Sequence, residues 1–142
     1  MSRVLDIVQN RDLFQVEEEQ TVAEVARHMM DLHVGAILVM NQGQLRGVFS
    51  ERDLMKRVVC EKLDPDRTPV REVMTHAVAT IDENASVEDA LQAMEANQCR
   101  HLPVTRGSRV VAFLSMRDLM HYELALKTEE LHHMRAYIHG SA

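Results

Sequence analysis

The chain has 142 residues, 46% hydrophobic and 27% charged, with 16 Lys and Arg against 22 Asp and Glu, which gives a formal net charge of −6. This size and composition predict an ordinary soluble globular protein that needs no metal or disulfide to hold its core. Basic runs and Trp are absent, which argues against nucleic-acid binding, and the longest apolar stretch, residues 34–40, is too short to cross a membrane. The N-terminus does not resemble a secretory signal, and two cysteines fit a reducing cytosol, so we expect a cytoplasmic protein.

An internal repeat organises the chain. Residues 11–57 align without a gap on residues 76–122 at a constant offset of 65. The strongest block pairs SERDLM at residues 50–55 with SMRDLM at residues 115–120. Each half is therefore predicted to be one copy of the same folding unit.

Within each copy the pattern predicts strand, helix, strand, strand and helix. The segments 21–24 and 86–89 match the capping box, in which a hydroxyl and a carboxylate three residues later satisfy the first N–H groups of a helix. Short apolar runs separated by turns predict two hairpins, with strands at 36–40 and 45–49 and at 101–104 and 110–114. Pro103 is expected to push its strand toward a sheet edge or a bulge.

The remaining segments divide the chain as residues 1–63 for the first repeat, 64–69 for a linker, 70–122 for the second repeat and 123–142 for a helical tail. The linker contains two prolines, and residues 2–7 and 68–73 are matched lead-in segments. The tail is predicted to stay helical to Ile138 and to stop at Gly140. Its apolar residues share one side, which favours packing on its own domain or on a second copy over a third-party partner. These residues are Leu124, Leu131, Met134 and Ile138.

The segments GVFSERDL at 47–54 and AFLSMRDL at 112–119, together with RHLPV at 100–104, resemble the cystathionine-β-synthase (CBS) domain in a tandem pair. The resemblance covers nearly the whole chain and implies an α+β fold of two βαββα repeats related by a pseudo-two-fold axis. It also implies a regulatory module that binds an adenosine compound such as AMP, ADP, ATP, NAD or S-adenosylmethionine, and a homodimer in which two pairs form a flat disk.

The Ser-x-x-Asp motifs, Ser50 with Asp53 and Ser115 with Asp118, allow two interpretations. Each motif is a capping box that satisfies the N–H groups at a helix start and does nothing more. The same geometry also suits a nucleotide, because a helix N-terminus favours phosphate and a carboxylate one turn in accepts bonds from ribose hydroxyls. The repeat and the resemblance together favour binding.

The two halves are not equivalent as binders. Beside its motif the second repeat has Arg100 and His101, where the first has Gly35 and Ala36, and an Arg fork suits phosphate. We expect the stronger site to use Asp118 for ribose, Ser115 for a hydroxyl or phosphate, and Arg100 with His101 for phosphate. By resemblance, backbone groups of Val34, Gly35 and Ala36 would read the adenine edge. The alternative for Arg100 and His101 is a solvated strand end near Glu95.

The symmetric site is expected to be weaker or empty. It would combine Ser50 and Asp53 with backbone groups of Cys99 and Arg100, and it would borrow charge from Arg52 or Lys56. Arg52 and Arg117 lie near helix starts, where they would bind phosphate from a partner subunit or pair with an acidic neighbour. Ala112 stands where the first repeat has Gly47, which adds a methyl group where a ligand would approach.

Other chemistry finds little support in the sequence. The eight histidines form no recognisable metal-ligand set, so no metal site is expected, and Cys60 and Cys99 are predicted to be small buried residues. Phosphate loops and nucleophile motifs are absent, so we do not expect an enzyme. The sequence predicts a nucleotide sensor that signals to an effector protein of unknown identity; the alternative is a ligand-free dimerisation or interaction module.

Overall fold

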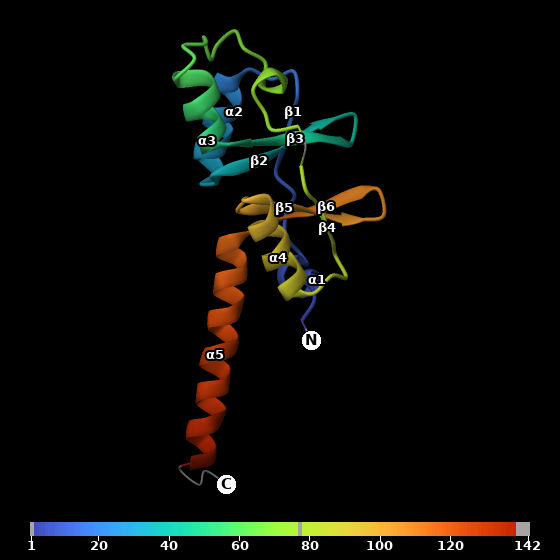
Figure 1. The fold of residues 1–142 in the computed structure, drawn as a ribbon, viewed down its shortest axis with the longest axis vertical. Helices are drawn as coiled ribbons and strands as arrows, with labels where there is room; N and C mark the ends of the chain where they lie inside the picture. The colour runs from blue at the N-terminus through green and yellow to red at the C-terminus, as the bar shows by residue number, and fades with distance from the viewer. Residues whose placement is uncertain (1, 77, 139–142) are drawn as a thin grey trace.

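Each half of the chain folds into a three-stranded sheet with helices packed against it (Figure 1). The computed structural model describes residues 2–76 and 78–138. The elements of the first repeat are β1 (Gln15–Glu17), α2 (Val22–Leu32), β2 (Ala36–Asn41), β3 (Gln44–Ser50) and α3 (Glu51–Asp53), which continues as a π-helix over Leu54–Val59. Those of the second are β4 (Ile81–Asp82), α4 (Val87–Asn97), β5 (His101–Arg106), β6 (Arg109–Ser115) and α5 (Met116–Ile138).

The two sheets have the same topology. In each, the first strand pairs parallel to the middle strand, and the middle strand pairs antiparallel to the third, in the orders β1-β2-β3 and β4-β5-β6. A β-bulge falls at matched positions of the two hairpins, after Val39 and after Val104. The predicted α+β fold of two βαββα repeats with a C-terminal helix is confirmed.

The long helix of each repeat begins and ends in the same way. The Thr21 hydroxyl accepts a hydrogen bond from the Glu24 N–H at 3.2 Å, and the Ser86 hydroxyl accepts one from the Asp89 N–H at 3.0 Å, as the capping boxes predict. The helices end at His33 and Gln98, whose φ angles of 57° and 50° are left-handed. Each helix buries one face on its sheet, made of Val22, Val25 and Met29 in α2 and of Val87, Ala90 and Met94 in α4.

Of the two positions predicted for Pro103, the sheet edge is wrong, whereas a β-bulge does lie beside it, at Val104 and Thr105. Pro103 is in β5, the middle strand, where it pairs with Phe113 of β6. The parallel partner β4 reaches only Val104 and Thr105, whereas β1 also pairs with the position in β2 that is equivalent to Pro103, Leu38. A proline has no N–H to donate, and the middle strand tolerates it because the parallel ladder begins one residue later.

The lead-in segments are exchanged between the repeats. Helix α1 (Val4–Val8) packs into the core of the second repeat, and its Val4 N–H donates to the Ala85 carbonyl at 2.8 Å. The short helix Val70–Glu72 packs into the core of the first repeat, with the Val70 N–H donating to the Gln20 carbonyl at 2.8 Å. The chain therefore crosses from one repeat to the other twice, once through residues 9–14 and once after Thr75 and before β4 (Figure 1).

Helix α5 changes character along its length. Leu119 is fully buried and Tyr122 is half-buried, but every residue from Glu123 to Ile138 is exposed, and the helix projects from the globular part (Figure 1). The tail is helical as far as Ile138, as predicted, and Gly140, the predicted stop, lies outside the described residues. Among the described residues, no helix combines the length and apolarity needed to traverse a bilayer.

Candidate functional site

The Ser115 and Asp118 side chains cap helix α5 at the end of strand β6. The Ser115 N–H donates to Asp118 Oδ2 at 2.8 Å, and the Asp118 N–H donates to Ser115 Oγ at 3.0 Å. Ser115 and Asp118 therefore do cap the helix, which is the first of the two interpretations of the Ser-x-x-Asp motif. Capping occupies only one carboxylate oxygen, because Oδ1 of Asp118 accepts no hydrogen bond from the described residues and the side chain is 19% exposed. That oxygen keeps its hydrogen-bonding capacity.

Arg11 completes this site, and the sequence did not point to it. It lies on the crossing between α1 and β1, and its Nη1 is 2.8 Å from Asp118 Oδ2. Partial burial alone raises the pKa of Asp118, but the bonds from Arg11 and Ser115 outweigh burial and hold the pKa below its usual value. The carboxylate is therefore ionised at neutral pH. Arg11 was hidden in the sequence because the exchanged lead-in, not the repeat motif, carries it to Asp118.

His101 lies at the start of β5, with its ring 5.2 Å from the ring of Phe113. Burial lowers the pKa of His101 and nearby Arg100 lowers it further, whereas Asp118 and Glu51 raise it; the result is below the usual value. His101 is thus neutral near pH 7, where it offers a donor or an acceptor and no charge. The sequence predicts that His101 binds phosphate. A neutral ring is less suited to that role than a charged one, because it brings no positive charge to the phosphate.

Arg100 is exposed, and within the described parts of the chain its side chain forms no ion pair, with Glu95 or with any other acid. Its carbonyl accepts a bond from the Met116 N–H at 2.7 Å, which fixes the start of α5 against the start of β5.

The first repeat contributes its own residues to this junction. Glu51 acts on the pKa of His101 across the two repeats, and a Cβ added at Gly35 would lie 3.1 Å from Glu51 Oε1. Part of the backbone predicted to read adenine is already bonded: the Val34 N–H donates to the Met29 carbonyl at 3.1 Å, and the Gly35 carbonyl accepts from the Glu51 N–H at 2.9 Å. Ala36 lies opposite Ser50 in the sheet. The Gly35 N–H and the Val34 carbonyl make no hydrogen bond to a described residue. Sequence reasoning missed Glu51.

The matched site of the first repeat is closed. Asp53 is 7% exposed, and its Oδ2 accepts bonds from the Ser50 N–H and the Ser50 hydroxyl, each at 3.0 Å. The Thr75 hydroxyl lies 3.2 Å from Asp53 Oδ1, and Arg57 Nε lies 3.7 Å from the same oxygen. Both carboxylate oxygens are thus occupied by the protein itself. Thr75 and Arg57 were not identified from the sequence.

The other predicted site residues form no side-chain hydrogen bond or ion pair with either aspartate in the part of the chain that the structure describes. Arg52, Lys56 and Arg117 are all exposed, and none forms an ion pair with a described residue, so the acidic neighbours expected for the two arginines are not seen. The cation beside Asp53 is Arg57. Cys99 is half-buried against the second core, and burial raises the pKa of its thiol. Cys60 is exposed, so its predicted burial is wrong, because the helix after β3 ends before that side chain reaches the core.

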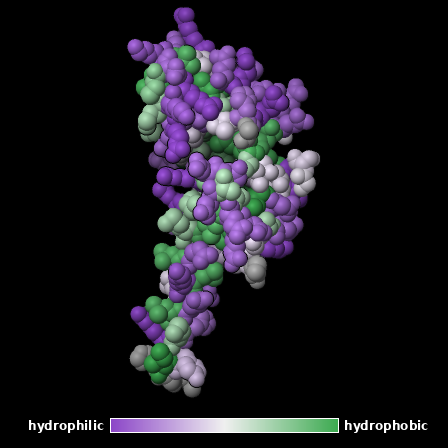
Figure 2. All heavy atoms as spheres, viewed as in Figure 1, coloured by the Kyte–Doolittle hydropathy of each residue, from purple (hydrophilic) through white to green (hydrophobic). Residues whose placement is uncertain are grey.

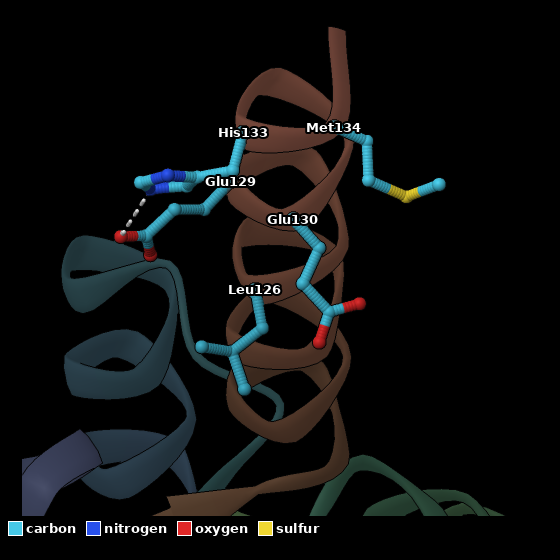
Figure 3. A pocket seen from close by; sticks show the side chains of 5 residues that line it. All are labelled: Leu126, Glu129, Glu130, His133 and Met134. Atoms are coloured by element: carbon cyan, nitrogen blue, oxygen red, sulfur yellow. Dashed lines mark ion pairs between the residues drawn. The ribbon is translucent and has the colours of Figure 1, made fainter. Parts of the chain in front are cut away.

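Surface hollows occur on the projecting part of α5. One is lined by Leu126, Glu129, Glu130, His133 and Met134, all from this single helix (Figure 3). A single helix cannot enclose a small ligand, so this hollow is no substitute for the Asp118 site. In the described segments, no three His, Cys, Asp or Glu side chains gather closely enough to hold a metal ion.

Two βαββα repeats with exchanged lead-ins, each with a Ser-x-x-Asp cap where its hairpin runs into a helix, define a tandem-repeat module of α+β class. The CBS domain model matches residues 4–60 and 70–125. The chain belongs to the CBS domain family.

Known proteins of the same family cover most of this chain. A CBS domain-containing protein of Bacillus subtilis, YhcV, is 38% identical over 104 residues, which are 73% of this chain and 74% of that protein. A putative signal-transduction protein with CBS domains from Burkholderia ambifaria superposes with a TM-score of 0.83 at 26% identity, over 87% of this chain and 95% of that one. A CBS domain protein of Pyrobaculum aerophilum, complexed with AMP, superposes with a TM-score of 0.75 at 27% identity, over 82% of this chain and 89% of that one.

Proposed function

We propose that this protein is a regulatory CBS pair that binds an adenine nucleotide at Asp118 and performs no catalysis. One observation carries the proposal: Asp118 keeps a carboxylate oxygen free of hydrogen bonds beside the guanidinium of Arg11, whereas the matched Asp53 is sealed by its own repeat. The AMP complex of the Pyrobaculum aerophilum protein supports an adenine nucleotide as the ligand class. Alternative ligands of the same class are ADP, ATP, NAD and S-adenosylmethionine.

The proposed binding follows from the chemistry of each group. Asp118 Oδ1 accepts hydrogen bonds from the ribose hydroxyls while Oδ2 remains in the cap. The phosphate meets Arg11 and Arg100, which stay charged at physiological pH. The adenine edge meets the free Gly35 N–H and Val34 carbonyl. His101 contributes a neutral ring at the same junction.

The second site, at Asp53, is weaker or empty in this proposal. A ribose there must displace the Thr75 hydroxyl and compete with Arg57 for a buried carboxylate. Exchanging existing hydrogen bonds for new ones gives little net affinity. We therefore propose one nucleotide per chain.

The output is a change in conformational populations. A ligand that contacts residues of both repeats stabilises the arrangement in which they meet, and this shifted population is what an effector protein or a partner subunit detects. The proposal includes a homodimer, as the family resemblance implies, and a cytoplasmic location, which the free cysteines suit. The alternative is a ligand-free interaction module, in which both aspartates are helix caps only.

Isothermal titration calorimetry of the purified protein with AMP, ADP, ATP, NAD and S-adenosylmethionine tests the proposal. Asp118→Asn is expected to weaken binding of the preferred nucleotide by about tenfold or more, because an amide replaces one acceptor oxygen with a donor. Asp53→Asn is the matched control and should leave that affinity within about twofold. Absence of binding by all five compounds, or equal losses in the two variants, overturns the proposal.

A further inference from the structure

Helix α5 carries an apolar stripe that no described part of the chain covers. Leu124 is 65% exposed, Leu131 49% and Ile138 71%, on a segment that projects from the globular part. Figure 2 shows apolar side chains along this projecting helix. The stripe consists of Met120, Leu124, Leu131, Met134 and Ile138. At about 100° per residue, all five fall within an arc of about 80° on the helix.

The stripe has the spacing of a coiled coil. Leu124, Leu131 and Ile138 are seven residues apart, and Met120 and Met134 occupy the positions four residues before a member of that series. In heptad terms the first set lies at a and the second at d. Lys127 fills the remaining d position, where its aliphatic stem covers apolar surface while its ammonium reaches solvent. In a parallel pair Lys127 faces Lys127 of the second copy, so the two ammonium groups extend away from each other into solvent, at a cost to the stability of the seam.

The flanks of the stripe carry complementary charge. The g positions on one side are Glu123, Glu130 and Tyr137, and the e positions on the other are His121, Thr128 and Arg135. In a parallel pair each g residue faces the e residue five positions later in the other helix, so Glu130 meets Arg135 of a second copy, twice by symmetry. In an antiparallel pair g faces g, and the glutamates would repel one another.

The other charges of the tail lie away from the stripe. The ion pair between Glu129 and His133, 3.8 Å long, extends from the side of the helix opposite Met134 (Figure 3). Leu126 also lies off the stripe, roughly 120° round the helix from Met120. These side chains therefore do not obstruct the stripe from packing against the same stripe of a second copy.

We propose that the projecting part of α5 pairs with the same helix of a second copy as a parallel two-stranded coiled coil, with Leu124, Leu131 and Ile138 in its seam. The stripe and its flanks are complementary to themselves, which singles out a second copy over a different partner. Two heptads are too short to associate stably as isolated helices, so the pairing acts together with the globular parts it holds side by side. Nucleotide binding at Asp118 is not required for it.

Disulfide trapping in the full chain tests this pairing. Cys60 and Cys99 are first replaced by Ser, and a cysteine is then introduced by Leu131→Cys in the seam or by Leu126→Cys off the seam as the matched control. Oxidation at low micromolar protein is expected to link the Leu131→Cys chains about tenfold faster, because equal a positions lie together only in a parallel pair. Circular dichroism verifies that each variant keeps its helix content.

Charge exchange in the Leu131→Cys background decides the orientation and the partner. Glu130→Arg alone and Arg135→Glu alone should each slow the trapping by about threefold or more, and the double exchange should restore it, because attraction returns with reversed signs. Equal trapping of the Leu131→Cys and Leu126→Cys proteins overturns the proposal. So does a double exchange that is slower than both single exchanges.

Discussion

Replacing Arg11 by Ala separates its two roles, which are to neutralise Asp118 and to meet a phosphate. The side chain is 40% exposed and touches a partly buried carboxylate, so the ion pair stabilises the fold by at most about 1 kcal/mol. A charge-assisted hydrogen bond to phosphate contributes about 1.5 kcal/mol or more, which is roughly tenfold in affinity. Arg11→Ala should therefore weaken AMP binding about tenfold while adenosine, which lacks phosphate, changes less than about threefold.

Titration calorimetry with AMP and adenosine measures both affinities, and Arg11→Lys is the control that keeps the charge but loses the planar fork. Thermal unfolding against pH provides a second readout. The folded state lowers the pKa of Asp118, so the stabilisation is present above the ordinary aspartate pKa of about 4 and is lost as the pH falls through the lowered value. The wild type and Arg11→Ala should converge there. Equal losses of AMP and adenosine affinity would refute a phosphate role for Arg11.

Three further predictions concern stability. Asp53→Ala should cost about 2 to 3 kcal/mol in urea unfolding and Asp118→Ala only about 1, because the buried Asp53 leaves more donors unpaired; equal costs would contradict the closed first site. Gly47→Ala should destabilise the fold by about 2 kcal/mol, since its Cβ would lie 2.5 Å from the Thr75 carbonyl oxygen, and an unchanged urea midpoint would count against that contact. The pKa of His101 is lowered on folding, so stability should fall as the pH drops below about 6.5, and His101→Gln should flatten the profile from pH 7 to 5; parallel profiles would rule this out.

The fold was predictable because local signals agreed with one another. The repeat, the capping residues Thr21 and Ser86, and the hairpin turns each specified a short segment, and all pointed to the same unit. Pro103 lies in the middle strand and not at an edge, although the predicted bulge is beside it. The tolerance of a middle strand for proline depends on the length of the neighbouring strand, β4, and a short strand made of Ile81 and Asp82 has almost no sequence signal. The exchange of the lead-in segments also has no local sequence signal, because it depends on which of two similar cores each segment enters.

The candidate site was predictable only as far as the repeat motif reaches. Ser115 and Asp118 were found because the motif occurs twice in register. Arg11 and Thr75 were missed because they reach the aspartates only through the crossings of the chain. Glu51 was missed because it acts on His101 only where the two repeats meet. Pairing Arg11 with His76 and Asn10 with Thr75 at the repeat offset does mark two polar positions before each first strand, but it does not show which aspartate they approach.

The asymmetry between the two sites originates in the crossings, not in the motifs. Both caps use the same hydrogen bonds, yet one crossing brings the short hydroxyl of Thr75 to Asp53 and the other brings the long cation of Arg11 to Asp118. Because the Thr75 side chain is short, its backbone lies close to the Asp53 carboxylate and pairs with Val48. Gly47 is needed beside it because the Thr75 carbonyl leaves no room for a methyl group. A long cation leaves the carboxylate partly open and adds charge for an anion. At the position matching Gly47, Ala112 is buried in the second core, so the methyl group expected to crowd a ligand packs among core side chains instead.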